Sequence, residues 1–420
     1  MSAPRLVMDL ARVGAAYRTM RAALPDVAVH YAMKCNPHPR VIAHLAALGC
    51  GFEIASAAEL EQLLAIGVPP REVLFSNPVK PETHIARAFA AGVHRFAFDS
   101  VDELHKLRRS AHGSSVYVRL AVPDLHSEVP SEGKFGVDLD SAAQLLLTAR
   151  DLGLDPHGVT FHVGSQMMHP RAWAQPLEMV GELMDKLLAE DVRVRLVDLG
   201  GGFPARYQGE PPPLEDYAAV IEAGLAALPY AVHSVIEPGR ALVAEAGTLI
   251  ANVIGVADRM GRRWVHLDVG AFNALMESLE TGNQLRFPVR DELGGPQLRR
   301  CQLTGPTCDS QDTILFDVEL SEGLATGDRV HLGSAGAYTT VYASSFNGFE
   351  PPVVDVLDAL DGAQPSAVDV HDASDGAQLS DVDVHDASDG AQPSGVDVLD
   401  AFDGVQPPVV HIRTQAGDLQ

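Results

Sequence analysis

The stretch Val-His-Tyr-Ala-Met-Lys-Cys-Asn-Pro at residues 29–37 opens the pattern that decides the fold. Its β-branched and aromatic residues predict a strand over 29–34, and the Cys-Asn-Pro turn ends it. Lys34 stands at that end, where loss of water penalises the charged ammonium group. Lys34 is therefore either an amine nucleophile with a lowered pKa, able to form a Schiff base with a carbonyl, or a surface lysine with its stem along the strand end.

The same kind of run recurs seven more times in the first 240 residues. The further predicted strands are 51–55, 73–77, 95–99, 116–120, 159–163, 196–200 and 234–237. Between them lie Ala- and Leu-rich segments that predict helices, such as 39–48, 57–65, 81–91, 101–109 and 172–189. Strands that alternate with helices predict a parallel sheet, and eight of them predict an α/β fold closed into a (β/α)8 TIM barrel over residues 1–240.

Two further regions follow the predicted barrel. Short alternating runs at 249–256, 264–269, 299–304 and 329–332 predict a C-terminal β-barrel or β-sandwich domain over 241–352. Residues 353–420 carry four copies of a 14-residue unit of the type Asp-Val-x-Asp-Ala-x-Asp-Gly-x-Gln, beginning at 355, 369, 383 and 397. This acidic segment has few large apolar residues, which predicts a disordered tail. A Ca²⁺-binding repeat and a stacked solenoid are the alternatives.

Composition excludes several function classes. No window approaches 18 continuous apolar residues and no secretion signal is evident, so we expect no membrane association. The net charge of −25 argues against nucleic-acid binding. The four cysteines show no metal-site spacing, so we expect no metal and free thiols in a reducing cytoplasm.

Active sites of such barrels lie at the carboxyl ends of the strands. The chemically notable residues of the predicted barrel all fall at that rim: Lys34, Glu53, Arg119, His162, Ser165, Gly200, Gly201, Gly202, Glu237 and Arg240. This convergence favours the nucleophilic interpretation of Lys34.

Three motifs on the rim indicate a shared ligand. The three glycines of Asp-Leu-Gly-Gly-Gly-Phe-Pro (198–204) suit a phosphate, or else a tight turn. In Glu-Pro-Gly-Arg (237–240), the glutamate suits a heterocyclic N–H and the arginine a phosphate, or the two form an ion pair. In Phe-His-Val-Gly-Ser-Gln (161–166), the histidine suits stacking on a flat ring and the serine a phosphate, although a buried histidine with its partners is the more common case. With a Schiff-base lysine, these features predict a pyridoxal 5′-phosphate (PLP) site.

A further motif lies in the predicted β domain. Gly-Pro-Thr-Cys-Asp-Ser-Gln-Asp (305–312) places the thiol of Cys308 beside two carboxylates. This arrangement suits a proton donor near a cationic substrate amine. A loop with a buried cysteine and a surface aspartate pair is the alternative.

From about residue 6 to 352 the chain resembles the fold-type III, alanine-racemase-like PLP decarboxylases of basic amino acids. The motifs that carry the resemblance are YAMKCNP, GFEIAS, FHVGSQ, DLGGGFP, EPGR, GPTCDSQD, GAYT and SSFNGFEPP. It implies that Lys34 holds PLP covalently, that Glu237 contacts the pyridine nitrogen and that His162 stacks on the ring. It also implies that the remaining cofactor contacts come from Glu53, Arg119, Ser165, Gly200, Gly201, Gly202, Gly239, Arg240 and Tyr338.

The resemblance also implies a homodimer with shared sites. Cys308 would return a proton to the substrate Cα across the interface, and Asp309 and Tyr338 would contact the substrate. Lys134 would pair across the interface, with Asp312 as its partner. The implied reaction converts L-ornithine to putrescine, for polyamine biosynthesis.

Two departures from the family pattern keep the substrate open. Ungapped counting after Phe272 and Asn273 puts Ser278 where an aspartate for the distal amine is expected, and Glu277 beside it is the candidate replacement. L-Lysine and diaminopimelate therefore stay as alternatives, as do an amino-acid racemase and, from another class, an inactive regulatory homologue. Only 33 residues precede Lys34, so the opening strand that joins the β domain is expected to be short or absent.

Overall fold

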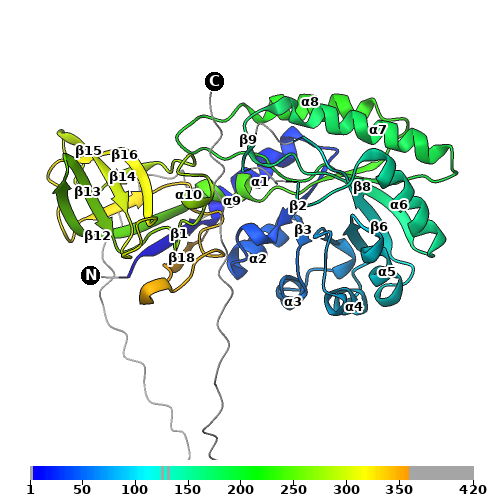
Figure 1. Cartoon of the computed structure of the whole chain (residues 1–420), viewed down its shortest axis with the longest axis horizontal. Coiled ribbons are helices and arrows are strands. Elements are labelled where there is room, and N and C mark those ends of the chain that lie inside the picture. Colours follow the sequence, from blue (N-terminus) through cyan, green and yellow to red (C-terminus); the bar gives the residue numbers. More distant parts are fainter. Residues whose placement is uncertain (1–2, 124–126, 130–132, 359–420) are drawn as a thin grey trace, which may run out of the picture. The chain divides into compact units, whose positions relative to one another are not determined.

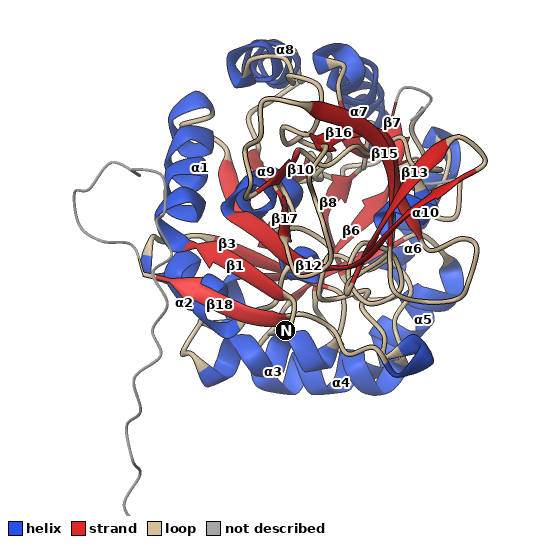
Figure 2. Ribbon diagram, turned by 90° about the vertical axis from the view of Figure 1, so that its left-hand side faces the viewer, coloured by secondary structure: helices blue, strands red, loops and turns tan. Residues whose placement is uncertain are grey.

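The first domain is a closed barrel of eight parallel strands in a computed structural model that describes residues 3–123, 127–129 and 133–358 (Figures 1 and 2). The barrel strands are β2 (Ala28–Ala32), β3 (Gly51–Ile54), β4 (Val73–Phe75), β5 (Arg95–Phe98), β6 (Ser115–Arg119), β8 (Asp155–Thr160), β10 (Leu196–Asp198) and β11 (His233–Ile236). Pairing of β11 with β2 closes the ring. The predicted (β/α)8 barrel is confirmed.

Helices surround the barrel, as Figure 2 shows. They are α1 (Leu10–Ala23), α2 (Pro39–Ala47), α3 (Ala57–Ala65), α4 (Glu82–Ala91), α5 (Val101–Ser110), α6 (Leu139–Asp151), α7 (Ala174–Leu188) and α8 (Leu214–Ala226). Short 3-10 turns lie at η2 (Pro70–Glu72) and η3 (Pro170–Trp173). Ser56 and Ser100 cap α3 and α5 by accepting backbone N–H groups of the first turn, which explains why both helices begin where the sequence predicts.

The first barrel strand ends earlier than predicted. β2 stops at Ala32, and Lys34 lies beyond it in the 3-10 turn η1 (Met33–Cys35). The N–H of Ala32 bonds the carbonyl of Pro238, and the carbonyl of Cys35 accepts the N–H of Tyr338. These two hydrogen bonds tie the turn to residues outside the barrel strands, and they fix Lys34 at the rim.

The barrel interior is filled below the rim. Leu74, Ala97, Tyr117, Leu196 and Val235, from five different strands, form a fully buried cluster of their own. The Tyr117 hydroxyl contacts Ser76 Oγ at 2.9 Å, just past the end of β4. This buried cluster fills the barrel interior beneath the rim residues.

The second domain is an eight-stranded sheet. Its main path runs β14 (Val289–Asp291), β17 (Arg329–Leu332), β12 (Gly247–Arg259), β13 (Arg262–Leu267), β15 (Leu298–Thr304) and β16 (Thr313–Ser321). Outside both large sheets, β7 (Ser127–Val129) and β9 (Ser165–Met167) of the barrel part form a separate antiparallel pair. The remaining short helices are α9 (Arg240–Val243), η4 (Ala244–Ala246), α10 (Glu277–Glu280) and η5 (Phe346–Gly348). The predicted β domain is confirmed, with more strands than the sequence indicated.

Both chain-end boundaries of this domain differ from the prediction. β1 (Arg5–Asp9) pairs antiparallel with β12 and parallel with β18 (Val353–Leu357). The opening strand is therefore present, and it belongs to the β sheet although residues 1–240 were assigned to the barrel. Residues 353–357 form a strand although they were assigned to the tail. The rest of the predicted acidic tail, 359–420, lies outside the described residues.

In the part of the chain that the structure describes, no helix is both long enough and apolar enough to span a membrane.

Candidate active site

A cavity of about 270 Å³ opens at the carboxyl ends of the barrel strands. Its lining comes from the ends of six strands and includes Lys34, Glu53, Ala55, Ser76, Asn77, Pro78, Arg119, Phe135, Thr160, Phe161, His162 and Glu237. The structure thus brings together five residues that the sequence placed at the rim: Lys34, Glu53, Arg119, His162 and Glu237.

Lys34 and Glu53 face each other in this cavity. Lys34 Nζ lies 3.9 Å from Glu53 Oε2, and the lysine side chain is about half exposed while Glu53 is buried. Among the described residues, Glu53 Oε2 has no hydrogen-bond partner. The negative charge of Glu53 raises the pKa of Lys34 against the effect of burial, so the lowered pKa expected for this amine was wrong. Burial in turn raises the pKa of Glu53 to about 8.

Glu237 belongs to a buried pair of carboxyl groups. Its Oε1 accepts a hydrogen bond from Ser76, and it also bonds the carboxyl of Asp198. Asp198 accepts bonds of 3.0 Å from Thr160 Oγ1 and from the N–H of Gly200. Burial, followed by the charge of Asp198, raises the pKa of Glu237 well above its usual range, and burial raises that of Asp198 to about 6. Two buried carboxyl groups in contact resist ionising together, so the pair favours holding a proton.

The sequence prediction missed Asp198 and Ser76. Asp198 stands directly before the three glycines of the Asp-Leu-Gly-Gly-Gly-Phe-Pro motif, which was a usable signal. Ser76 follows an apolar strand and carries no motif, so only the fold reveals that it reaches Glu237.

His162 and Arg119 complete the cavity wall. Burial, reinforced by the positive charge of Arg119, lowers the pKa of His162 to about 3. The imidazole is therefore neutral at physiological pH. The Arg119 guanidinium lies 5.2 Å from the centre of the Phe135 ring.

The glycine motif has a structural reason of its own. Gly200 and Gly202 have φ of +64° and +103°. A Cβ on Gly200 would lie 2.2 Å from the carbonyl oxygen of Phe161, and a Cβ on Gly202 would lie 2.4 Å from the carbonyl oxygen of Gly164. The tight-turn interpretation therefore explains these glycines, and phosphate binding by Gly200, Gly201 and Gly202 stays a prediction. At Gly239 a Cβ would lie 2.8 Å from Cys35 Cβ, so this glycine keeps the eighth strand end close to the Lys34 turn.

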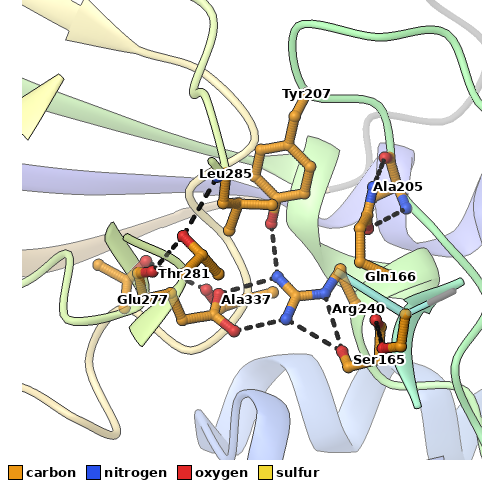
Figure 3. A network of polar contacts seen from close by, with 11 residues as sticks. Ser165, Gln166, Ala205, Tyr207, Arg240, Glu277, Thr281, Leu285 and Ala337 are labelled. Carbon is orange, nitrogen blue, oxygen red and sulfur yellow. Dashed lines mark hydrogen bonds and ion pairs between the residues drawn. The ribbon is translucent and has the colours of Figure 1, made fainter. Parts of the chain in front are cut away.

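Arg240 lies buried between the two domains. Its guanidinium forms an ion pair with both carboxylate oxygens of Glu277. The alternative interpretation of the sequence, an ion pair between Arg240 and Glu237, was therefore wrong. The guanidinium also donates to Tyr207 and to Ser165, as Figure 3 shows. Tyr338 of the β domain reaches the same place, with its ring centre 4.9 Å from the Arg240 Cζ.

The residues assigned to substrate and dimer contacts lie apart from this cavity. Cys308 and Asp309 are exposed on the loop between β15 and β16, where Asn347 Nδ2 lies 3.4 Å from Cys308 Sγ. Asp312 is fully buried and accepts bonds from the N–H of Ala271 and from Thr307. Lys134 is exposed, with Nζ 5.0 Å from the Phe135 ring. Asp312 thus ties its own loop to the segment after β13, and its pairing with Lys134 of a second chain stays a prediction.

Comparison with known proteins agrees with this geometry. The family model for the pyridoxal-binding domain of pyridoxal-dependent decarboxylases matches residues 10–244. Ornithine decarboxylase of Schizosaccharomyces pombe is 34% identical over 84% of this chain and 83% of that protein. Lysine/ornithine decarboxylase of Selenomonas ruminantium is 35% identical over 82% of this chain and 87% of that protein. The crystal structure of lysine/ornithine decarboxylase from Vibrio vulnificus, complexed with putrescine, matches with a TM-score of 0.78 and 32% identity over 85% of this chain and 94% of that one. The chain belongs to the family of pyridoxal-dependent decarboxylases.

Proposed function

We propose that this PLP-dependent decarboxylase acts on a basic L-amino acid, with L-ornithine as the main substrate and putrescine as the product. The observation that carries the proposal is the Lys34 amine beside Glu53, in one cavity with the buried carboxyl group of Glu237. The relatives named ornithine decarboxylase and lysine/ornithine decarboxylase support this choice of substrate.

The cavity fits the cofactor in three respects. Glu53 Oε2 is a buried acceptor that lacks a hydrogen-bond donor among the described residues. Glu237, whose pKa burial raises well above its usual range, offers a carboxyl group to a pyridine nitrogen, and His162 offers a neutral flat ring for stacking. Each of these groups lines the same cavity as Lys34.

Several residues of this chain would hold the cofactor and move protons. Bound PLP supplies the electron sink for the electron pair left when the Cα–carboxylate bond breaks. Lys34 must lose a proton from Nζ before it can bond a carbonyl carbon. Glu53, whose Oε2 lies 3.9 Å from Lys34 Nζ, would accept that proton in its ionised form. Glu237 would keep a proton at the ring nitrogen, and Ser165, Arg240 and the glycine motif would hold the phosphate.

Substrate selection would depend on a second copy of the chain. The exposed Cys308 would protonate the substrate Cα in the partner's site, and Asp309 would bind its distal ammonium group. An exposed thiol that must stay reduced also supports a location in the cytoplasm.

L-Lysine is the second candidate substrate. Ser278 is fully buried and donates to the carbonyl of Leu275, so the position where a second distal-amine carboxylate is expected supplies no charge. A site that relies on Asp309 alone would discriminate less between amines of different reach.

The test compares CO₂ release from ornithine, lysine, arginine and diaminopimelate by the wild-type chain and by Lys34→Ala. We expect ornithine to be fastest, and Lys34→Ala to be inactive and to lack absorbance at about 420 nm, typical of PLP bound to lysine. Wild-type protein inactive on ornithine and lysine would refute the substrate assignment. An absorbing protein inactive on all four would favour the regulatory homologue.

A mixture of variants tests the shared site. Lys34→Ala and Cys308→Ala proteins, each inactive alone, should regain about a quarter of wild-type activity when mixed, because half of the dimers combine both chains and hold one intact site. No recovery in a mixture shown to exchange subunits would exclude a site shared between chains.

A further inference from the structure

Every N–H donor of Arg240 is already engaged within this chain. A guanidinium group carries five N–H donors. Nη1 donates to Tyr207 and Glu277 at 2.8 Å each, and Nη2 to Glu277 at 2.5 Å and to Ser165 at 3.2 Å. Nε donates to Ser165 at 3.4 Å. A phosphate that binds Arg240 must therefore replace one of these partners.

The five contacts differ in how readily they are replaced. Glu277 contributes two short, charge-assisted bonds from a side chain that is 5% exposed. Ser165 accepts the two longest bonds and lies only on the edge formed by Nε and Nη2. Figure 3 shows Glu277 and Ser165 on different sides of the guanidinium. The Ser165 edge is therefore the one that a phosphate can take over.

Glu277 is held in place from its own element. It begins the short helix α10, and its carbonyl accepts a bond of 2.8 Å from Thr281 Oγ1. Both carboxylate oxygens of Glu277 bond Arg240, so a substrate amine would have to share them with the guanidinium. Its charge also cancels that of Arg240 at the place where an anion is to bind.

We propose that Glu277 is the positioning residue of Arg240: it turns the Nε–Nη2 edge toward the phosphate of the cofactor and, by neutralising the guanidinium, limits the affinity for that phosphate. The inference deepens the proposed function, since it rests on Arg240 as a phosphate ligand. It replaces the assignment of Glu277 to the distal amine of the substrate.

The experiment titrates the full-length chain, freed of cofactor, with PLP and with pyridoxal, which lacks the phosphate. Glu277→Gln keeps the shape and removes the charge, so we expect PLP to bind about three- to tenfold more tightly and pyridoxal to bind as in the wild type. Glu280→Gln is the matched control, because it removes the same charge from the same helix at an exposed side chain. Its PLP affinity should change less than about twofold.

Several outcomes would overturn the proposal. Unchanged or weaker PLP binding by Glu277→Gln would do so. An equal gain in affinity for pyridoxal would also do so, because it would place the effect away from the phosphate. Unchanged PLP affinity with a tenfold higher KM for ornithine would return Glu277 to the substrate. If Glu277→Gln does not fold, Glu277→Asn, which also keeps an amide oxygen as acceptor without the charge, must show the same selective gain. A wild-type chain that binds neither PLP nor pyridoxal would refute the cofactor assignment as well, whereas the other outcomes leave it intact.

Discussion

Two buried ion pairs stand near the cavity, and they are built differently. Lys80 Nζ lies 2.9 Å from Glu103 Oε1, with both side chains almost fully buried inside the barrel domain. Lys80 also donates to the carbonyls of Asn77 and Ala97, so backbone groups complete its shell. Arg240 and Glu277 instead join α9 to α10, and hydroxyl groups of Tyr207 and Ser165 complete the shell of the arginine.

The difference separates a structural pair from an adjustable one. Backbone carbonyls cannot turn away, so Lys80 fixes the loop that brings Asn77 and Pro78 to the cavity wall. A serine hydroxyl can rotate and be replaced by a ligand oxygen without moving the backbone. A buried pair thus stabilises one conformation when its partners are main-chain groups, and it can take part in binding when one partner is a side chain.

The largest expected effect comes from breaking the structural pair. Lys80→Met leaves the buried Glu103 carboxylate with Lys106 and the backbone N–H of residue 80, and we expect the free energy of unfolding in urea to fall by about 3 kcal/mol. Lys106→Met, which removes a partly exposed partner of the same carboxylate, should cost less than half as much. The double variant Lys80→Met/Glu103→Leu should recover most of the loss, because an apolar pair needs no compensation. A loss below 1 kcal/mol for Lys80→Met would show that the pair is not structural.

A truncation tests whether the join between the domains depends on the Arg240–Glu277 pair or on its strands. Deleting residues 353–420 removes β18, whose partly buried Val354 and Val356 pack against the core beside β1, and should cost about 2 kcal/mol of unfolding free energy. Deleting only 359–420 should leave both stability and CO₂ release unchanged. Glu277→Gln should change the free energy of unfolding by the same amount in both truncated chains. Equal stability of the two truncated chains would contradict the role of β18.

The pH dependence of the unfolding free energy distinguishes the Lys80–Glu103 pair from the Arg240–Glu277 pair, and the expected effect is smaller. Burial lowers the pKa of Lys80 to about 8, against the charge of Glu103. In the unfolded chain the ordinary value, about 10.4, applies. Between these values the unfolded chain binds more protons than the folded one, so the folded state gains stability as pH rises.

The difference in unfolding free energy between wild type and Lys80→Met should therefore widen from pH 8 to 10, by on the order of 1 kcal/mol. For Arg240, burial acts to lower the pKa, but Tyr207 and Glu277 raise it well above its ordinary value. The corresponding difference for Glu277→Gln should stay constant over the same pH range. A narrowing difference for Lys80→Met would mean that attraction to Glu103 outweighs desolvation.

Much of the candidate site was predictable because its signals are local. The apolar runs that carry Lys34, Glu53, His162 and Glu237 at or near their carboxyl ends predict strands one after another, and parallel strands bring these ends to one rim. Ser76 and Tyr207 could not be found in this way, because each reaches its partner from a segment without a motif.

The sequence by itself determined the barrel, the β domain and the set of residues at the rim, because periodicity and turn chemistry act over a few neighbouring residues. Only the tertiary structure decided that β1 pairs with β18 and that Arg240 pairs with Glu277 instead of Glu237. It also reversed the expected pKa shift of Lys34, because the Glu53 carboxylate lies 3.9 Å away. Partners and pKa values depend on which distant groups the fold brings within a few ångströms, and no local pattern records that.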